Sequence, residues 1–433
     1  MSTDLKRMRR RQLLTIGLLF VLYSGCYLCR SNFSVTLPLI RDSLVEAGYA
    51  PDDARQRLGA VASLGVLAYA IGKFFTGTLA DFLGGRRNIV LGMFGSVAFT
   101  LLFALSPGVP LFTVAWFGNR LVQSFVWTGM VKVTGRWFSF ASYGTAMGVV
   151  SLSYLFGDGA ARLFIGELLN RGLGWRAVFA VAAGVLALLL AIVWIWLKES
   201  PSDVGLSEPP ANPQNVFGAA GQEDHPPNLR GLLVPLFTSP VFLVVCYLSL
   251  GLTLLRETFN TWSAFYFTDA LGLSQAEAAN RSALFPLLGG VSVIAAGCVG
   301  DWLGRGGRAA VILFGLLGTA IVLAVLGTVN FGSASAAPIA LVSLVGFLVL
   351  GPYSYLAGAI SLDLGGKRGS ATACGIIDGV GYLGGMAAGD TVARLTGHYG
   401  WSGTFQALAA VAALTSAGAA LFWLMQRTRN SAS

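Results

Sequence analysis

The sequence predicts an all-α integral membrane protein with twelve transmembrane helices in two six-helix bundles. Of its 433 residues, 55% are hydrophobic and only 11% are charged, whereas soluble chains carry about a quarter charged residues. About twelve apolar stretches reach the roughly 20 residues that a helix needs to cross a bilayer. Membrane barrel strands are about half that length, and backbone groups in lipid must be paired internally, so these stretches are expected to be helices.

The first predicted span follows a basic run at residues 6–11, as the apolar region of a signal peptide does. Its apolar stretch is too long for a signal peptide and lacks a small-residue cleavage site, so we expect it to remain as a helix. The predicted spans cover residues 12–37, 58–81, 88–107, 110–136, 143–170, 175–197, 241–267, 276–300, 309–328, 337–362, 369–396 and 402–425.

Basic residues predict how these spans are oriented. They gather in the even-numbered connections and the tails, which the positive-inside rule places in the cytoplasm. We therefore expect both termini in the cytoplasm and the protein in the plasma (inner) membrane. The same loops account for the formal charge of +9, and they form no contiguous basic face, so no nucleic-acid partner is expected. The residues are Arg86, Arg87, Arg136, Lys198, Arg305, Arg308, Lys367, Arg368, Arg427 and Arg429.

Residues 199–233 are rich in proline and polar residues and predict a cytoplasmic linker. It separates an N-terminal six-helix bundle, residues 1–198, from a C-terminal one, residues 234–433. Internal repetition supports this division, because Gly174-Trp175 returns as Gly400-Trp401. A longer motif, Gly77-x-x-x-Asp81-x-x-Gly84-Gly-Arg86, returns as Gly297-x-x-x-Asp301-x-x-Gly304-Arg305. Repeated halves of this kind place a binding site at their interface near the bilayer midplane.

Arg30 and Arg256 lie at matching places in the first and seventh predicted spans. A charge at the bilayer centre costs roughly 2.5–3.5 kcal/mol, so such residues usually serve a function. A guanidinium can hold a phosphate through two hydrogen bonds and keeps its charge when dehydrated. The pair therefore predicts a site for a small anion between the two halves.

Lys73, Arg120, Glu257 and Asp378 also lie within spans, with no partner of opposite charge one helical turn away. Together with the two arginines they give four cations and two acids, so a cavity that holds them would be net positive without an anion. Lys73 and Arg120 are therefore expected to bind the substrate together with Arg30 and Arg256. Glu257 and Asp378 are expected either to balance Lys73 and Arg120 in the empty site or to couple a proton.

Two further charged positions have a simpler interpretation. Asp158 precedes Arg162 by one helical turn, the favourable order for an ion pair within a helix, and is expected to be balanced by it. Lys132 lies one turn before Arg136 at a helix end, so its side chain is expected to reach out to the membrane surface.

Tyr27, Tyr154, Trp262 and Tyr382 are candidate contacts for the organic part of a substrate, although aromatic residues also pack in such spans. No metal site is expected, because Cys26-x-x-Cys29 has no second pair or nearby histidine to complete it. No cofactor is expected, and no set of nucleophile, base and orienting residue indicates an enzyme.

The doubled glycine–aspartate motif resembles the loop that members of the major facilitator superfamily carry between helices 2 and 3 and between helices 8 and 9. The resemblance implies that Asp81 and Asp301 cap neighbouring helices and help to close the cytoplasmic side. Gly77, Arg86, Gly297 and Arg305 belong to the same two loops. A tight turn with arginines facing lipid phosphates would explain one copy of the motif, but two copies at equivalent places favour the superfamily.

Other motifs resemble the organophosphate:phosphate antiporters, the family of the glycerol-3-phosphate, hexose-phosphate and glucose-6-phosphate carriers. Arg30-Ser-Asn-Phe-Ser-Val-Thr-Leu-Pro38 is similar to their first-helix signature, and Tyr69-Ala-Ile-Gly-Lys73 to their second helix. Arg256 falls where bacterial members place a second phosphate-binding arginine. The sequence departs from the family at Gly157, where a histidine is usual. It departs again at Asn119-Arg120-Leu-Val-Gln123, which resembles an arginine motif of other facilitators.

The resemblance and the intramembrane charges together predict a secondary transporter. It would exchange an organic phosphate ester for inorganic phosphate by alternating access, as a monomer in the lipid bilayer. Two alternatives remain open. Arg120, Glu257 and Asp378 are also compatible with a proton-coupled carrier of another organic anion, and some family relatives are membrane sensors of sugar phosphate.

Overall fold

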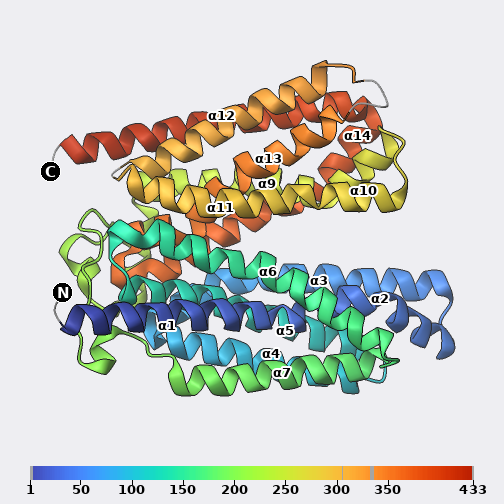
Figure 1. The fold of residues 1–433 in the computed structure, drawn as a ribbon, viewed down its shortest axis with the longest axis horizontal. Coiled ribbons are helices and arrows are strands. Elements are labelled where there is room, and N and C mark those ends of the chain that lie inside the picture. Colours follow the sequence, from blue (N-terminus) through green and yellow to red (C-terminus); the bar gives the residue numbers. More distant parts are fainter. Residues whose placement is uncertain (1–2, 305, 332–335, 432–433) are drawn as a thin grey trace.

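A computed structural model describes residues 3–304, 306–331 and 336–431, which form helices and connecting loops. The helices form two groups that lie side by side along the length of the molecule, the first bundle (α1–α7) and the second bundle (α9–α14) (Figure 1). Both chain termini lie at one end of the molecule, together with the segment that connects the bundles (Figure 1). We call this end the linker end.

The first bundle is built from seven helices. Pro51 begins α3, a position where the missing N–H of proline costs nothing, and Gly84 ends it with a φ of 94° that favours glycine. The bounds are α1 (Thr3–Cys26), α2 (Leu28–Glu46), α3 (Pro51–Leu83), α4 (Gly85–Leu105), α5 (Val109–Trp137), α6 (Tyr143–Asn170) and α7 (Trp175–Trp196), with the short helix η1 (Phe140–Ser142) before α6.

The connecting segment is partly helical. It contains η2 (Pro201–Val204), η3 (Gly218–Gln222) and α8 (Leu229–Phe237). The side chain of Asn228 accepts a hydrogen bond from the backbone N–H of Gly231 and so caps α8. The helix runs through residue 233, where the sequence predicts the end of the linker.

The second bundle contains helices that are interrupted. Ala283 separates α10 from α11, and α14 has non-helical backbone at Gly366, Gly369 and Gly400. The bounds are α9 (Pro240–Asp269), α10 (Gln275–Ser282), α11 (Leu284–Trp302), α12 (Gly307–Thr328), α13 (Ala337–Tyr355), the π-helical η4 (Leu356–Ile360) and α14 (Ser361–Ser431).

The prediction of twelve membrane crossings is confirmed. Nine stretches of the described residues are long and apolar enough to span a membrane. One of them, Ala337–Gly389, contains the predicted span 337–362 and most of 369–396, so the nine account for ten crossings. The other two crossings are α5 and α6, which are 29 and 28 residues long and carry charged residues. The first predicted span differs from the expectation, because a turn at Tyr27 divides it into α1 and α2.

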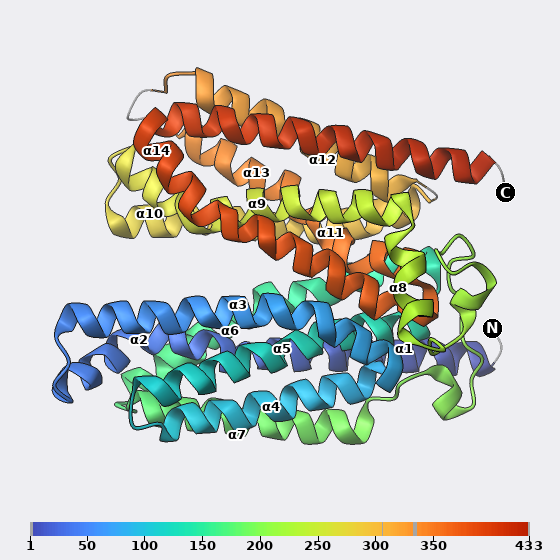
Figure 2. The ribbon, with the colours of Figure 1, turned by 180° about the vertical axis from the view of Figure 1, so that it is seen from behind.

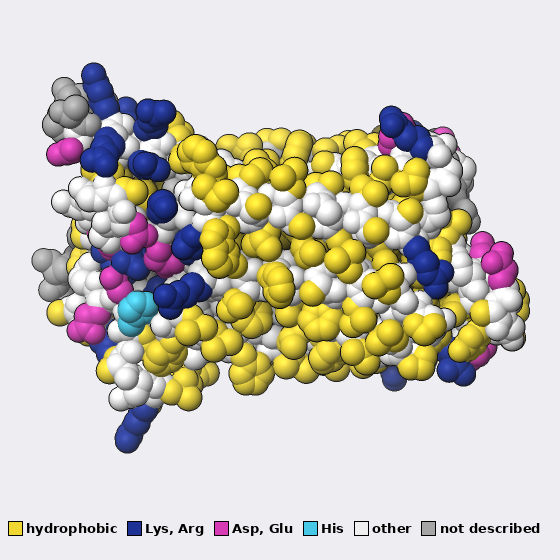
Figure 3. All heavy atoms as spheres, turned by 90° about the horizontal axis from the view of Figure 1, so that it is seen from below, with side chains coloured by type: hydrophobic (Ala, Val, Ile, Leu, Met, Phe, Trp, Pro, Cys, Tyr) yellow, Lys and Arg dark blue, Asp and Glu magenta, His cyan; other side chains and the backbone are white. Residues whose placement is uncertain are grey.

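The two bundles meet along a few helices. Figure 2 shows α3 of the first bundle facing α14 of the second, and Figure 1 shows α6 of the first bundle facing α11 of the second. A belt of hydrophobic side chains covers the middle of the molecule, while lysine and arginine gather mainly at the linker end (Figure 3). The protein is therefore a multi-pass membrane protein, and on the face shown in Figure 3 its basic side chains lie mainly at the linker end.

Candidate functional site

A cavity of about 760 Å³ lies between the two bundles, within the range of small-molecule sites. Helices α2, α3 and α5 contribute Arg30, Lys73 and Arg120, and α9 and α14 contribute Arg256 and Asp378. The structure thus brings together charged residues that lie far apart in the sequence.

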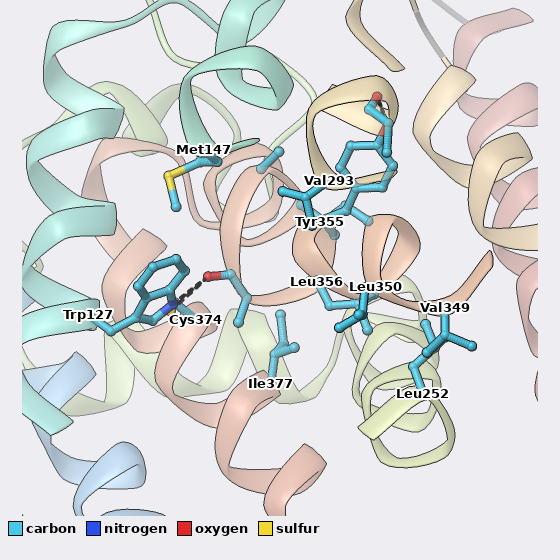
Figure 4. Close-up of a cluster of buried hydrophobic side chains, with 14 of the residues drawn as sticks. Trp127, Met147, Leu252, Val293, Val349, Leu350, Tyr355, Leu356, Cys374 and Ile377 are labelled. Atoms are coloured by element: carbon cyan, nitrogen blue, oxygen red, sulfur yellow. Dashed lines mark hydrogen bonds between the residues drawn. The ribbon is translucent and has the colours of Figure 1, made fainter. Parts of the chain in front are cut away.

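The cavity opens away from the linker end. On its open side lie Asp158 and Arg162, whose side chains are 40% and 53% exposed. On its inner side, the indole N–H of Trp127 donates to the carbonyl oxygen of Ala357 across the two bundles at 3.0 Å (Figure 4). Ala357 lies in η4, where non-helical dihedral angles accompany the π-helical turn. This contact closes the floor of the cavity.

Three cations surround the ring of Tyr69. The charged groups of Arg30, Lys73 and Arg120 each lie 4.8 Å from the centre of this ring, a distance at which cation–π attraction is significant. Tyr69 is buried and lies one helical turn before Lys73 on α3. Tyr69 belongs to a motif that resembles the second helix of the family, but the sequence alone does not predict it as a site residue.

The two acids of the predicted set pair with different cations. Lys73 forms a buried ion pair with Asp378 at 2.7 Å, which links α3 to α14, as one of the sequence-based alternatives has it. Glu257 was expected to balance Lys73 or Arg120, but it pairs instead with its neighbour Arg256. The guanidinium of Arg256 also lies 4.2 Å from the ring centre of Tyr353, a contact that the sequence did not predict.

The remaining predicted residues are only partly brought to the cavity. Asp158 pairs with Arg162 at 3.0 Å, as predicted, and also accepts a hydrogen bond from Ser31. Tyr27, Tyr154 and Tyr382 line the cavity, but Trp262 does not. The indole of Trp262 instead donates to the carbonyl of Ala388 at 3.0 Å, a contact that sequence spacing gives no way to foresee.

The two repeated aspartates each cap a helix of the opposite bundle. Asp81 accepts hydrogen bonds from the backbone N–H and the hydroxyl of Thr372, each at 2.7 Å. Asp301 accepts from the backbone N–H groups of Gly144 and Thr145 at 3.0 and 2.6 Å. Carboxylates at helix N-termini are stabilised by the unpaired N–H groups there.

The glycines of the two loops allow this approach. A Cβ on Gly77 would collide with the carbonyl oxygen of Ala371, and one on Gly297 would lie 2.8 Å from that of Gly144. Arg86 does not reach the opposite bundle, since it donates to the carbonyl of Trp194 in α7. Arg305 lies outside the described residues.

Lys132 corrects a prediction. It does not reach the membrane surface but is fully buried, and its ammonium group pairs with Asp81 at 2.8 Å. The partner comes from another helix, so the spacing to Arg136 along α5 gave no sign of it.

The predicted linker is tied to both bundles. Glu208 accepts hydrogen bonds at 2.8 Å from Arg136 of α5 and from Lys367 of α14. Asp224 also pairs with Arg136 at 2.8 Å. Burial acts to raise the pKa of Glu208, but the hydrogen bonds from Lys367 and Arg136 lower it to about 2. The linker therefore joins the bundles through ion pairs, in addition to the chain connection.

Comparisons with known proteins agree with this architecture. The Major Facilitator Superfamily model matches residues 9–389. The human organic anion transporter MFSD10 has a similar structure, with a TM-score of 0.70, 15% identity, and 94% of this chain and 99% of that chain covered. A structure of the transporter FucP in its outward conformation gives a TM-score of 0.71 at 14% identity, covering 95% and 99% of the two chains. These two likenesses concern the fold.

Curated relatives match over most of the chain. A glycerol-3-phosphate transporter of Bacillus subtilis (strain 168) is 25% identical and covers 98% of this chain and 94% of its own length. A glucose-6-phosphate exchanger of Mus musculus is 29% identical, with 84% and 78% covered. A membrane sensor protein of Escherichia coli (strain K12) is 24% identical, with 94% and 90% covered. On its fold and on the match of its family model, this chain belongs to the Major Facilitator Superfamily of membrane transporters.

Proposed function

We propose that the protein exchanges an organic phosphate ester for inorganic phosphate by alternating access, as a monomer with the linker end in the cytoplasm. The observation that supports this most is the charge of the central cavity. Five cations and three acids line it: Arg30, Lys73, Arg120, Arg162, Arg256, Asp158, Glu257 and Asp378. Buried charge of one sign is costly unless it is compensated, so the cavity is suited to a multiply charged anion.

Phosphate fits these residues better than a carboxylate does. A phosphoryl group has three oxygen atoms that can accept hydrogen bonds from several guanidinium groups at once, and arginine binds phosphate in a bidentate manner. Curated relatives named as glycerol-3-phosphate and glucose-6-phosphate carriers support the same substrate class.

The geometry also supports an alternating cycle. The cavity opens on one side, and the other side is closed by contacts between the bundles, including Trp127–Ala357 and Lys73–Asp378. A bound anion would lower the repulsion among the cations while the two bundles rearrange around it. Without a bound anion, the cations would repel one another during the same rearrangement, which raises its barrier. The protein is therefore expected to change conformation mainly with substrate bound, which favours exchange over net transport.

The test uses purified protein in proteoliposomes. Vesicles are preloaded with one member of a panel of phosphate esters, and the uptake of labelled inorganic phosphate is measured. We expect glycerol or sugar monophosphates inside the vesicles to stimulate uptake, while carboxylates of similar size do not. Equal stimulation by the carboxylates would contradict the proposal.

A membrane sensor of sugar phosphate is a second candidate, because the sensor protein of Escherichia coli matches this chain about as well as the transporters do. Phosphate binding by the purified protein without any phosphate uptake would favour the sensor over the transporter.

A further inference from the structure

We propose that the phosphoryl group of the substrate binds on the first bundle, between Arg30 and Arg120, and that the second bundle binds the organic part. This inference rests on the proposed function and deepens it. A symmetric arrangement, in which Arg30 and Arg256 share the phosphoryl group, is the alternative that the matching positions of these two arginines predict.

The pairing of charges separates the two arrangements. Each of the three acids that line the cavity is paired with one cation: Asp158 with Arg162, Asp378 with Lys73, and Glu257 with Arg256. Among the described residues, Arg30 and Arg120 are the two cavity cations without an acid within ion-pair distance. The uncompensated charge of the cavity therefore lies on α2 and α5, both in the first bundle.

Hydrogen bonds connect Arg120 to the helix that carries Arg30. Arg120 donates to the side-chain oxygen of Gln123 at 3.0 Å. The amide nitrogen of Gln123 in turn donates to Asn119 at 2.7 Å and to the carbonyl of Cys29, the residue before Arg30, at 3.2 Å. Gln123 thus ties the position of Arg120 to the backbone of α2 next to Arg30.

Aromatic contacts leave the two guanidinium groups available to an anion. Both pack at 4.8 Å from the ring centre of Tyr69, and Arg30 also lies 5.1 Å from that of Tyr27. Ring contacts compensate a positive charge only partly. Both arginines also line a smaller recess of about 250 Å³ that adjoins the open side of the cavity. A phosphoryl group placed there can accept hydrogen bonds from the guanidinium groups of both arginines.

The opposite wall has the chemistry for the organic part. It presents the carboxylate of Glu257, the amide of Asn260 and the hydroxyl of Tyr353. These groups can bind the hydroxyls of a glycerol or sugar unit, while Glu257 would repel a second phosphoryl group. We therefore expect monophosphate esters to be preferred over bisphosphates.

The experiment measures equilibrium binding of labelled inorganic phosphate to purified protein. Because hydrogen bonds to charged groups are strong, Arg30→Gln and Arg120→Gln should each raise Kd by about tenfold to a hundredfold. The double variant Arg256→Gln with Glu257→Gln removes a paired charge and should change the Kd for inorganic phosphate by no more than about threefold. The same double variant should weaken the binding of glycerol-3-phosphate relative to inorganic phosphate.

Arg57→Gln is the matched control, because Arg57 lies on the first bundle, is exposed and pairs with Asp53 at 2.8 Å outside the cavity. Gel filtration and thermal unfolding check that each variant is folded. If Arg120→Gln does not fold, Arg120→Lys takes its place: it keeps the charge, loses the fork and should still weaken phosphate binding.

The outcomes separate this inference from the proposed function. Wild-type affinity for inorganic phosphate in a folded Arg120 variant would overturn the inference while the proposed function stands. The same conclusion follows if the double variant of Arg256 and Glu257 loses phosphate as fully as Arg30→Gln does. A wild-type protein that binds no phosphate at all would overturn both.

Discussion

Tyr69 shows how one aromatic side chain can organise several charges. Its ring lies 4.8 Å from the cationic groups of Arg30, Lys73 and Arg120, and 5.3 Å from the ring of Tyr382 on the other bundle. The negative face of an aromatic ring attracts cations, and this attraction offsets part of the repulsion among the three charges. We therefore propose Tyr69 as a positioning residue for the proposed anion site.

We expect Tyr69→Leu to raise the KM for phosphate by about tenfold or more, because it removes a contact to three cations, each worth about 0.5–2 kcal/mol. Tyr69→Phe keeps the ring and should stay close to wild type. Initial rates of exchange in proteoliposomes measure both variants. If Tyr69→Leu and Tyr69→Phe behave alike, the ring does not position the cations.

At this scale the sequence predicts residue types better than partners. Arg30, Arg120 and Arg256 stand out because a charge within an apolar span is costly. Their partners depend on how each helix is rotated toward its neighbours, which a single sequence does not reveal. This is why the sequence did not pair Glu257 with Arg256 or Lys132 with Asp81. It also explains why Trp262 could be named as a candidate contact although its indole donates to the carbonyl of Ala388.

At the scale of elements, the loops and the linker control contact between the bundles. Asp81 and Asp301 bind helix N-termini across the bundle interface, and small glycines lie where the backbones approach most closely. The motif was visible in the sequence, but its contacts across the two bundles appear only in the fold.

Gly77→Ala should keep the linker end from closing, because the added Cβ would collide with the carbonyl oxygen of Ala371. Overpacking of this kind costs roughly 1–3 kcal/mol, enough to reduce transport by about tenfold or more. Gly59→Ala on the same helix is the control, since nothing lies within 4 Å of a Cβ there. Equal transport by the two variants would show that close approach at Gly77 is not required.

Glu208 allows a test of the linker. Its carboxylate bridges Arg136 and Lys367, so Glu208→Gln should make the linker end open more often. A cysteine introduced at the buried Ser370 should then react with a thiol reagent about threefold to tenfold faster, in a protein otherwise free of cysteine. Glu46→Gln, at an exposed glutamate of α2, is the control and should leave the rate unchanged.

The same residue predicts a pH dependence. The pKa of Glu208 falls from 4.5 to about 2 in the closed linker end. A lowered pKa means that the ionised carboxylate stabilises closure fully above pH 4.5 and loses this effect only as the pH falls toward 2. The labelling rate at Ser370→Cys should therefore not respond to Glu208 between about pH 6 and pH 8. A change with pH in wild type that disappears in Glu208→Gln would contradict this assignment.

The order and number of the elements were predictable because hydropathy and span length are properties of single helices. The interruptions were not. Two interruptions arise from local backbone geometry within apolar sequence, namely the turn at Tyr27 and the π-helical segment Leu356–Ile360. The same holds for the end of α8, which extends past residue 233. At Gly366 and Gly400 the φ angles of 57° and 65° favour glycine, but the chain has 56 glycines and most of them lie within regular helices.

At the scale of the whole molecule, charge and conformation are coupled. The ion pair of Lys73 with Asp378 joins the two bundles in the wall of the cavity, so it must separate if the bundles part there. Breaking a buried pair is costly unless another charge replaces the lost partner. A bound phosphate can take that place for Lys73, which is how the substrate would lower the barrier for rearrangement.

Uptake of labelled inorganic phosphate into proteoliposomes tests this coupling most directly. Vesicles preloaded with unlabelled phosphate are compared with vesicles that contain buffer alone, each with and without an imposed pH gradient. We expect rapid uptake into the preloaded vesicles, background uptake into the empty ones, and little response to the gradient. Gradient-driven uptake into vesicles without internal phosphate, abolished in Glu257→Gln or Asp378→Asn, would contradict phosphate exchange and establish a proton-coupled carrier instead.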